Sequence, residues 1–142
     1  DLSGKDVMRK IMILARESGQ VIEMDDITNN SFMPEACMQG TVADFYQSME
    51  EHEAHFKKIY DEAAAAGCKL KFVASYKDGK ANVGLLHIPP PHDFYHLYGK
   101  DNIVLFYTDR YTQQPLVIKG AGAGAALTAS GVFADIIRTS KA

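Results

Sequence analysis

Asp6 and Lys10 are the residues whose types and spacing best suit acid–base chemistry. They stand four positions apart in a stretch that predicts a helix, so both side chains rise from the same helical face. One interpretation is a surface ion pair, which contributes little to stability. The other is that Lys10, beside the apolar residues Val7, Ile11 and Leu14, is partly desolvated and needs Asp6 or a ligand next to its charge. Spacing alone leaves both interpretations open.

A run of glycine and alanine from Gly120 to Gly124 precedes a predicted helix. Backbone N–H groups at a helix N-terminus can bind a phosphate or another anion when no side chain shields them. The spacing is not GxGxxG, and the sequence ends before the acidic residue that a dinucleotide fold carries about 20 positions further on. A cofactor-binding loop and a tightly packed loop therefore both fit this run.

Neither the histidines nor the cysteines predict a metal centre. The sequence His52-Glu-Ala-His55 is not the His-Glu-x-x-His zinc pattern, and no CxxC spacing occurs. Solvent-facing or hydrogen-bonded core histidines, and two reduced thiols, are the expectation for the following residues: His52, His55, His87, His92, His96, Cys37 and Cys68.

The elements that must position these groups begin with a helix from Ser3 to Ser18. Ser3 suits the N-cap, and Gly19 suits the left-handed residue that closes a helix. The pattern from Gln20 to Pro34 is weaker and predicts a turn around Asn29 to Ser31. Helical periodicity returns from Gly40 to Ala66, with a break near Glu51 that predicts two helices.

The second half of the sequence predicts strands. The segment Lys69 to Tyr76 alternates between apolar and polar residues, Asp78-Gly79 is a strong hairpin turn, and Ala81 to Ile88 is the return strand. Three prolines then end the pairing, because proline has no N–H to donate. Two further strands are expected over Asn102 to Thr108 and Pro115 to Ile118.

A small-residue loop over Gly120 to Ala126 and a helix over Thr128 to Thr139 complete the chain. This order predicts an α+β fold, with a mixed, largely antiparallel sheet whose one face is covered by helices. No internal repeat or low-complexity linker divides the 142 residues, so we expect one domain over residues 1–142.

Composition narrows the class of partner. The net charge is −3 and no Lys/Arg-rich stripe occurs, which argues against nucleic acid. The apolar runs are strand-sized, and no secretory signal precedes the first helix, so we expect neither a membrane span nor export, but a cytoplasmic location. A chain that starts without Met, directly at a helix, suggests a fragment.

Motifs at both ends resemble those of homoserine dehydrogenases. The segment from Asp1 to Lys10, DLSGKDVMRK, resembles the family signature D-L-x-G-x-D-V-x-R-K. The segment from Gly120 to Asp135 resembles the closing G-x-G-A-G…T-A-x-G-V-x-x-D pattern. The sequences from Leu14 to Glu17 and from Pro115 to Ile118 resemble those of bifunctional aspartokinase–homoserine dehydrogenases. The resemblance therefore covers essentially the whole chain.

The resemblance implies a substrate-binding and dimerisation domain that acts with NAD or NADP on L-homoserine and L-aspartate 4-semialdehyde, in threonine and methionine biosynthesis. It makes Lys10 and Asp6 the catalytic pair and Asp1 a substrate-binding residue. It also suggests cofactor contacts at Gly122 and Gly124. No metal ligand is implied.

The resemblance further implies parts that the sequence does not contain. The Rossmann glycines, an acidic residue and a second lysine of the family would lie upstream, as would an aspartokinase domain. Residues from about 120 to 142 would return to pack on the Rossmann domain, and the chain would form a homodimer through its sheet. By itself the chain is expected to have no dehydrogenase activity and to act only as a dimerisation module.

Overall fold

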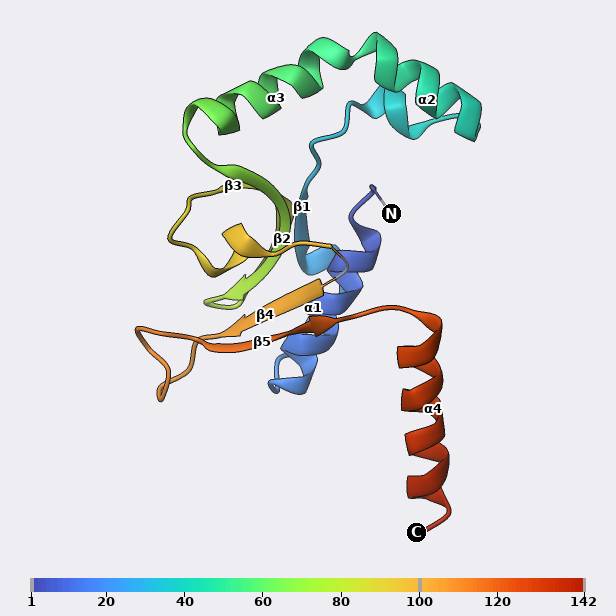
Figure 1. The fold of residues 1–142 in the computed structure, drawn as a ribbon, viewed down its shortest axis with the longest axis vertical. Helices are drawn as coiled ribbons and strands as arrows, with labels where there is room; N and C mark the ends of the chain where they lie inside the picture. The colour runs from blue at the N-terminus through green and yellow to red at the C-terminus, as the bar shows by residue number, and fades with distance from the viewer. Residues whose placement is uncertain (1, 100, 142) are drawn as a thin grey trace. The chain divides into compact units, whose positions relative to one another are not determined.

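The computed structural model describes residues 2–99 and 101–141, which form two compact units. The first unit extends to Tyr95 and the second begins at His96. The first contains α1 to α3 and the strands β1 to β3, and the second contains β4, β5 and α4 (Figure 1).

Helix α1, Lys5–Glu17, carries the predicted catalytic pair. Its end is as predicted, because Gly19 has φ 89° and donates to the Arg16 carbonyl oxygen, while Gln20 donates to that of Ala15. Its start differs from the prediction. Gly4, not Ser3, is the N-cap residue, in the left-handed conformation and without a side-chain cap.

The buried face of α1 also differs from the predicted one. Met8 and Ala15 are buried, and Met12 packs against the same core, whereas Leu14 is exposed. Val7 and Ile11 lie at the margin of this contact, as partly buried neighbours. Compared with the prediction, the buried stripe of α1 is therefore rotated toward Met8 and Met12. Methionine side chains are flexible and fill irregular gaps between a helix and a sheet.

A three-stranded sheet supports α1. Its order is β1 (Ile27–Asn30), β3 (Lys80–Ile88) and β2 (Lys69–Lys77), with β1 parallel and β2 antiparallel to β3. The predicted hairpin is confirmed, since Asp78 and Gly79 both have positive φ. The turn predicted around Asn29 to Ser31 is wrong, because the central β3 strand pairs with Ile27–Asn30 and draws these residues into the sheet.

The core of the first unit lies between α1 and this sheet. Alternation places one set of sheet side chains on the α1 face, as predicted for β2. The residues that meet the helix from the sheet are Ile27, Phe72, Ala74, Tyr76, Ala81 and Val83.

The predicted helical region from Gly40 to Ala66 is confirmed as two helices. These are α2, Val42–Glu51, and α3, Glu53–Ala65, which follow one another in an arc (Figure 1). A capping box starts α2: the Thr41 hydroxyl accepts from the Asp44 N–H, and the Asp44 carboxylate accepts from the Thr41 N–H at 2.7 Å. Short 3-10 turns stand at η1 (Met24–Asp26), η2 (Glu35–Met38) and η3 (Asp93–His96).

The second unit is a hairpin followed by a helix. Strands β4, Asp101–Phe106, and β5, Leu116–Ala121, pair antiparallel, and α4 covers Ala125–Thr139. The predicted loop over Gly120 to Ala126 is too long, since β5 continues through Ala121 and α4 begins at Ala125. Only residues 122–124 connect them.

The α+β class and the closing helix are confirmed. The strands divide, however, between a mixed three-stranded sheet and a separate two-stranded one. Among the described residues, no helix is both long and apolar enough to cross a bilayer.

Candidate active site

The predicted catalytic pair forms a close ion pair on α1. Lys10 Nζ lies 2.8 Å from Asp6 Oδ2, and the two side chains are 60% and 57% exposed. The hydrogen bond and positive charge of Lys10 lower the pKa of the Asp6 carboxyl below its ordinary value of 3.8, and Arg9 adds to the effect. Asp6 therefore stays a carboxylate throughout the neutral pH range, beside the ammonium group.

The pair lies away from the core of its unit. Met8, Met12 and Ala15 face the sheet and Leu14 is exposed, while Val7 and Ile11 are only partly buried at the margin of the core. Of the two interpretations of the pair, the solvent-exposed ion pair agrees better with the 60% exposure of the Lys10 side chain. An ammonium and a carboxylate presented to solvent on one helix remain accessible to a polar substrate. Asp1, expected to bind substrate, lies outside the described residues.

The glycine run divides into positions with different roles. Gly120 lies in β5, where a Cβ would meet nothing within 4 Å. At Gly122 a Cβ would fall on the side-chain amide of Asn102, so the bare backbone there accommodates Asn102. Gly124 is the N-cap residue of α4 with φ 133°, a conformation that L side chains rarely adopt.

Sequence reasoning missed Asn102 and, on the first unit, Asn29. The Asn29 side chain donates to the Ser3 carbonyl oxygen at 2.8 Å, across 26 residues of sequence. From the sequence, Asn29 is an ordinary turn residue and Asn102 an ordinary strand residue. Only the tertiary structure brings Asn29 beside Gly4 and Asn102 beside Gly122. For Asn102 the available signal was an asparagine in a predicted strand, where it is disfavoured, whereas Asn29 lay in a predicted turn and gave no such signal.

Most histidines for which contacts are described have backbone partners. His52 Nδ1 lies 2.8 Å from the Ser48 carbonyl oxygen, His55 Nε2 lies 2.9 Å from that of Phe32, and His92 Nδ1 accepts from the Phe94 N–H. In residues 2–99 and 101–141, no three His, Cys, Asp or Glu side chains gather as a metal site would require. Both cysteines are free thiols, and Cys37 is buried.

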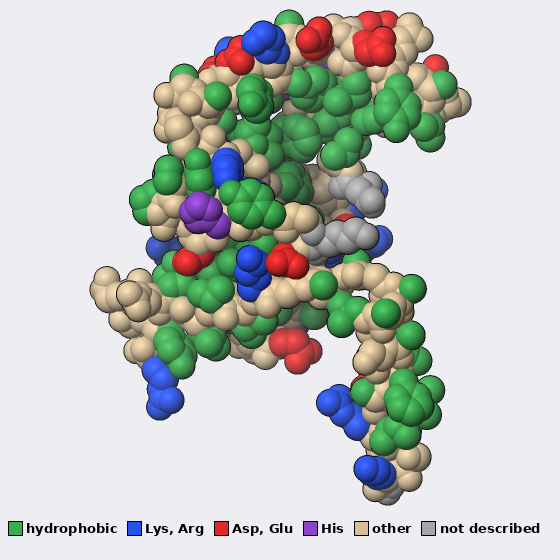
Figure 2. Space-filling model, viewed as in Figure 1, with side chains coloured by type: hydrophobic (Ala, Val, Ile, Leu, Met, Phe, Trp, Pro, Cys, Tyr) green, Lys and Arg blue, Asp and Glu red, His purple; other side chains and the backbone are tan. Residues whose placement is uncertain are grey.

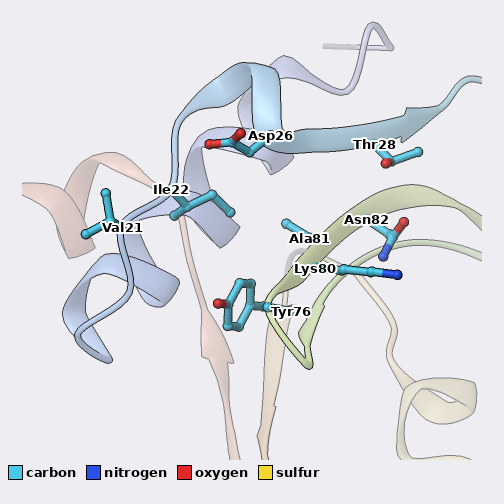
Figure 3. Close-up of a pocket in the computed structure, with 9 residues that line it drawn as sticks. Val21, Ile22, Asp26, Thr28, Tyr76, Lys80, Ala81 and Asn82 are labelled. Carbon is cyan, nitrogen blue, oxygen red and sulfur yellow. The ribbon is translucent and has the colours of Figure 1, made fainter.

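A polar hollow of about 560 Å³ opens at one end of the three-stranded sheet (Figure 3). Asp26, Thr28, Lys80 and Asn82 line it together with Tyr76. The Asp26 carboxylate already accepts from the Glu23 N–H at 2.8 Å, and the Tyr76 hydroxyl donates to Gln20. The hollow contains neither Asp6 nor Lys10 among its lining residues, so it is distinct from the predicted site.

The fold has close counterparts among solved structures. A Candida auris protein of unknown function superposes with a TM-score of 0.87 at 38% identity, over 99% of this chain and 40% of that one. A Staphylococcus aureus homoserine dehydrogenase superposes with a TM-score of 0.68 at 23% identity, over 99% of this chain and 31% of that one. The second likeness shows a shared fold.

A sequence profile described as homoserine dehydrogenase matches residues 1–137. The chain therefore belongs to the homoserine dehydrogenase family, as the motifs at both of its ends suggested.

Its relatives include both fused and single enzymes. A chloroplastic bifunctional aspartokinase/homoserine dehydrogenase 1 of Zea mays is 45% identical over 99% of this chain. A homoserine dehydrogenase of Paracoccidioides brasiliensis is 39% identical over 97%. The matched region is 16% of the maize protein and 38% of the fungal one, so this chain spans only a part of the relatives it matches.

Proposed function

We propose that this chain is the substrate-binding and proton-transfer part of an enzyme that interconverts L-homoserine and L-aspartate 4-semialdehyde with NAD or NADP. The observation that carries the proposal is the 2.8 Å Lys10–Asp6 ion pair, in a chain that the family profile matches from residue 1 to 137. An ion pair by itself would not suffice, since Lys57 and Asp61 form a similar one on α3. The family motif distinguishes the two pairs.

The chemistry of the reaction explains why a lysine is useful. A bound nicotinamide supplies the hydride that reduces the aldehyde, or accepts it from the alcohol. As the aldehyde carbon is reduced, negative charge develops on its oxygen, and that oxygen needs a proton. The Lys10 ammonium can hydrogen-bond to this oxygen and then donate the proton. A lysine ordinarily carries this proton at neutral pH.

Asp6 orients the donor. Its carboxylate takes one of the three ammonium hydrogens, which leaves the other two for substrate oxygen atoms. Because its own pKa is lowered, it remains charged and keeps Lys10 in place over the working pH range. In the oxidative direction Lys10 must first lose a proton to act as base, so we expect homoserine oxidation to rise with pH.

One feature of the described residues that suits a phosphate of the dinucleotide is a helix N-terminus beside the glycine run. The N-terminus of α4 follows Gly124, which carries no side chain and would meet nothing within 4 Å if it did. Gly122 is the weaker candidate, since Asn102 already occupies the space beside it. The remaining dinucleotide contacts are proposed to come from an upstream Rossmann domain. Asp1 is proposed to bind the polar groups of the substrate.

The proposal of an upstream aspartokinase domain rests on the relatives. Fused aspartokinase domains in maize and Haemophilus influenzae proteins support a similar arrangement upstream of this chain. We also propose a homodimer formed through the sheet, a role in threonine and methionine biosynthesis, and a cytoplasmic location. We propose that residues 1–142 form one domain. Its last part, from about residue 120 to 142, would pack on the nucleotide-binding domain.

The test uses the full-length protein that contains this chain. Oxidation of NADPH or NADH is followed with L-aspartate 4-semialdehyde, and the 142-residue chain alone is the comparison. We expect turnover only in the full-length protein, because the chain alone lacks the Rossmann glycines. Absence of turnover in a folded, cofactor-binding full-length protein would reject the proposed activity.

A non-catalytic dimerisation module is the second candidate. It is favoured by the second unit, in which no described residue from 96 to 141 is buried although many are apolar. Such a unit needs partner surface. A full-length protein that dimerises through this chain but retains turnover after Lys10→Ala would favour this second function.

A further inference from the structure

The turn that precedes α1 is held by a contact with the sheet. Asn29 Nδ2 donates to the Ser3 carbonyl oxygen at 2.8 Å, a short distance for an N–H···O bond. Asn29 belongs to β1, whose Ile27 packs in the core with Met8 of α1. The bond therefore connects the chain just before the helix to a strand on which the same helix rests.

Gly4 makes this contact possible. A Cβ on Gly4 would stand 3.1 Å from Asn29 Oδ1 and 3.2 Å from Phe72 Cζ, closer than most such contacts. Its φ of 78° also favours glycine. The Gly4 carbonyl oxygen accepts from the Met8 N–H at 2.9 Å, so the residue under the Asn29 amide also begins the helical hydrogen bonding.

The local sequence supplies no strong alternative for fixing this start. Helix α1 has no side-chain cap, and the Lys5 N–H reaches the Ser3 hydroxyl only at 3.4 Å. Asp6 lies in the first turn of the helix and Lys10 one turn later. A movement of the Ser3–Gly4 turn would therefore shift the carboxylate that holds the ammonium.

The neighbouring Asn30 provides a natural comparison. Successive strand residues point to opposite faces of a sheet, so Asn30 faces away from α1. It pairs with Gly84, whose Cβ would lie 3.0 Å from that of Asn30. The two asparagines therefore share residue type and strand, and differ in whether they reach the turn before α1.

We propose that Asn29 is a positioning residue for the Asp6–Lys10 pair, acting through the Ser3 carbonyl and the close packing on Gly4. The inference rests on the proposed dehydrogenase function for its catalytic consequence, and on geometry alone for the anchored turn. It predicts that the Asn29 amide determines how well the ammonium is placed at the substrate oxygen.

The experiment compares Asn29→Asp with Asn30→Asp in the full-length protein. Aspartate keeps the shape of asparagine but has no N–H to donate, and it places a carboxylate against the Ser3 carbonyl oxygen. We expect Asn29→Asp to lower kcat about tenfold or more, because misplacement of a catalytic group is costly, and to leave the KM for NADPH unchanged. Asn30→Asp should keep both constants near the wild-type values.

Hydrogen exchange of the α1 first-turn amides reports on the anchor without any need for turnover. We expect exchange about tenfold faster in Asn29→Asp than in Asn30→Asp, because local opening exposes those amides. If Asn29→Asp fails to fold, Asn29→Ala takes its place, since it removes the donor without adding a charge.

Three results would overturn the proposal or its basis. Unchanged exchange in both Asn29 variants rejects the anchor. Faster exchange with unchanged kcat rejects the positioning role and leaves a structural one. Absence of turnover in the wild-type protein itself rejects the proposed function, with the exchange result still deciding whether the anchor exists.

Discussion

Two ion pairs at the residue scale share nearly the same geometry. Lys10–Asp6 on α1 and Lys57–Asp61 on α3 are both i,i+4 pairs, with N···O distances of 2.8 and 2.6 Å and similar exposure. Distance and burial therefore cannot separate a catalytic pair from a surface pair. What separates them is the family motif around Lys10 and the hydrogen bond from Asn29 to the turn before Asp6.

These two pairs supply a matched mutational test. Lys10→Ala in the full-length protein should lower kcat by about a hundredfold or more, which is the usual contribution of a general acid or base. Lys57→Ala removes a similar charge and should leave kcat near the wild-type value. Both are measured by steady-state kinetics with L-aspartate 4-semialdehyde, and equal effects of the two substitutions would contradict the role of Lys10.

Asp6 predicts a pH dependence of stability. Its pKa is lowered in the folded protein by Lys10, so its stabilising effect is present above the unfolded-state value and is lost as the pH falls through the folded one. The difference in Tm between wild type and Asp6→Asn should be constant well above the ordinary carboxyl pKa of 3.8 and should shrink as the pH falls below it. A difference that persists in strong acid, or that does not shrink in about 1 M salt, would exclude this ion pair as its cause.

At the scale of elements, the connection between β5 and α4 depends on one glycine–asparagine contact. Gly122→Ala would bring a Cβ onto the Asn102 amide, whereas Gly120→Ala meets open space at an unstrained φ. We expect Gly122→Ala to lower the free energy of local unfolding by about 1–3 kcal/mol, the usual cost of overpacking, and Gly120→Ala to change it little. Native-state hydrogen exchange of the β5 amides measures both.

A second substitution tests the cause. Removal of the amide by Asn102→Ala should restore most of the protection that Gly122→Ala loses, because the two side chains would no longer compete for the same space. Strictly additive losses in the double variant would show that the Asn102 contact is not what requires glycine at position 122.

On the scale of the whole molecule, many apolar side chains of the second unit are exposed. Figure 2 shows them along α4, and those of β5 are exposed as well. The exposed residues are Leu116, Val117, Ile118, Leu127, Val132, Phe133, Ile136 and Ile137. Exposed apolar side chains in this number are typical of interaction sites.

We therefore predict that the isolated 142-residue chain self-associates. Light scattering should give a mass at least twice that of the 15.7 kDa monomer, rising with concentration. The substitution Phe133→Glu, at a side chain that is 64% exposed, should weaken the self-association if α4 takes part in it. A monomer at all concentrations would contradict the proposed dimerisation through this chain.

Local patterns in the sequence were sufficient to predict many elements. The hairpin at Asp78-Gly79, the helix end at Gly19 and the two-helix region over residues 42–65 all depend on neighbours within a few positions. The motif that carries Asp6 and Lys10 was likewise visible, since their i,i+4 spacing fixes their proximity on any helix.

Only the tertiary structure decided which contacts form between residues that are far apart in the sequence. Asn29 and Asn30 are turn-forming residues by local preference, but β3 offers them backbone partners and makes them a strand. The predicted cap at Ser3 gave way to Gly4, and the Asn29 amide instead donates to the Ser3 carbonyl oxygen, 26 positions away in the sequence. The sequence by itself determined the family and the predicted Asp6–Lys10 pair, whereas the proposed anchor of that pair depends on long-range packing, which no local pattern encodes.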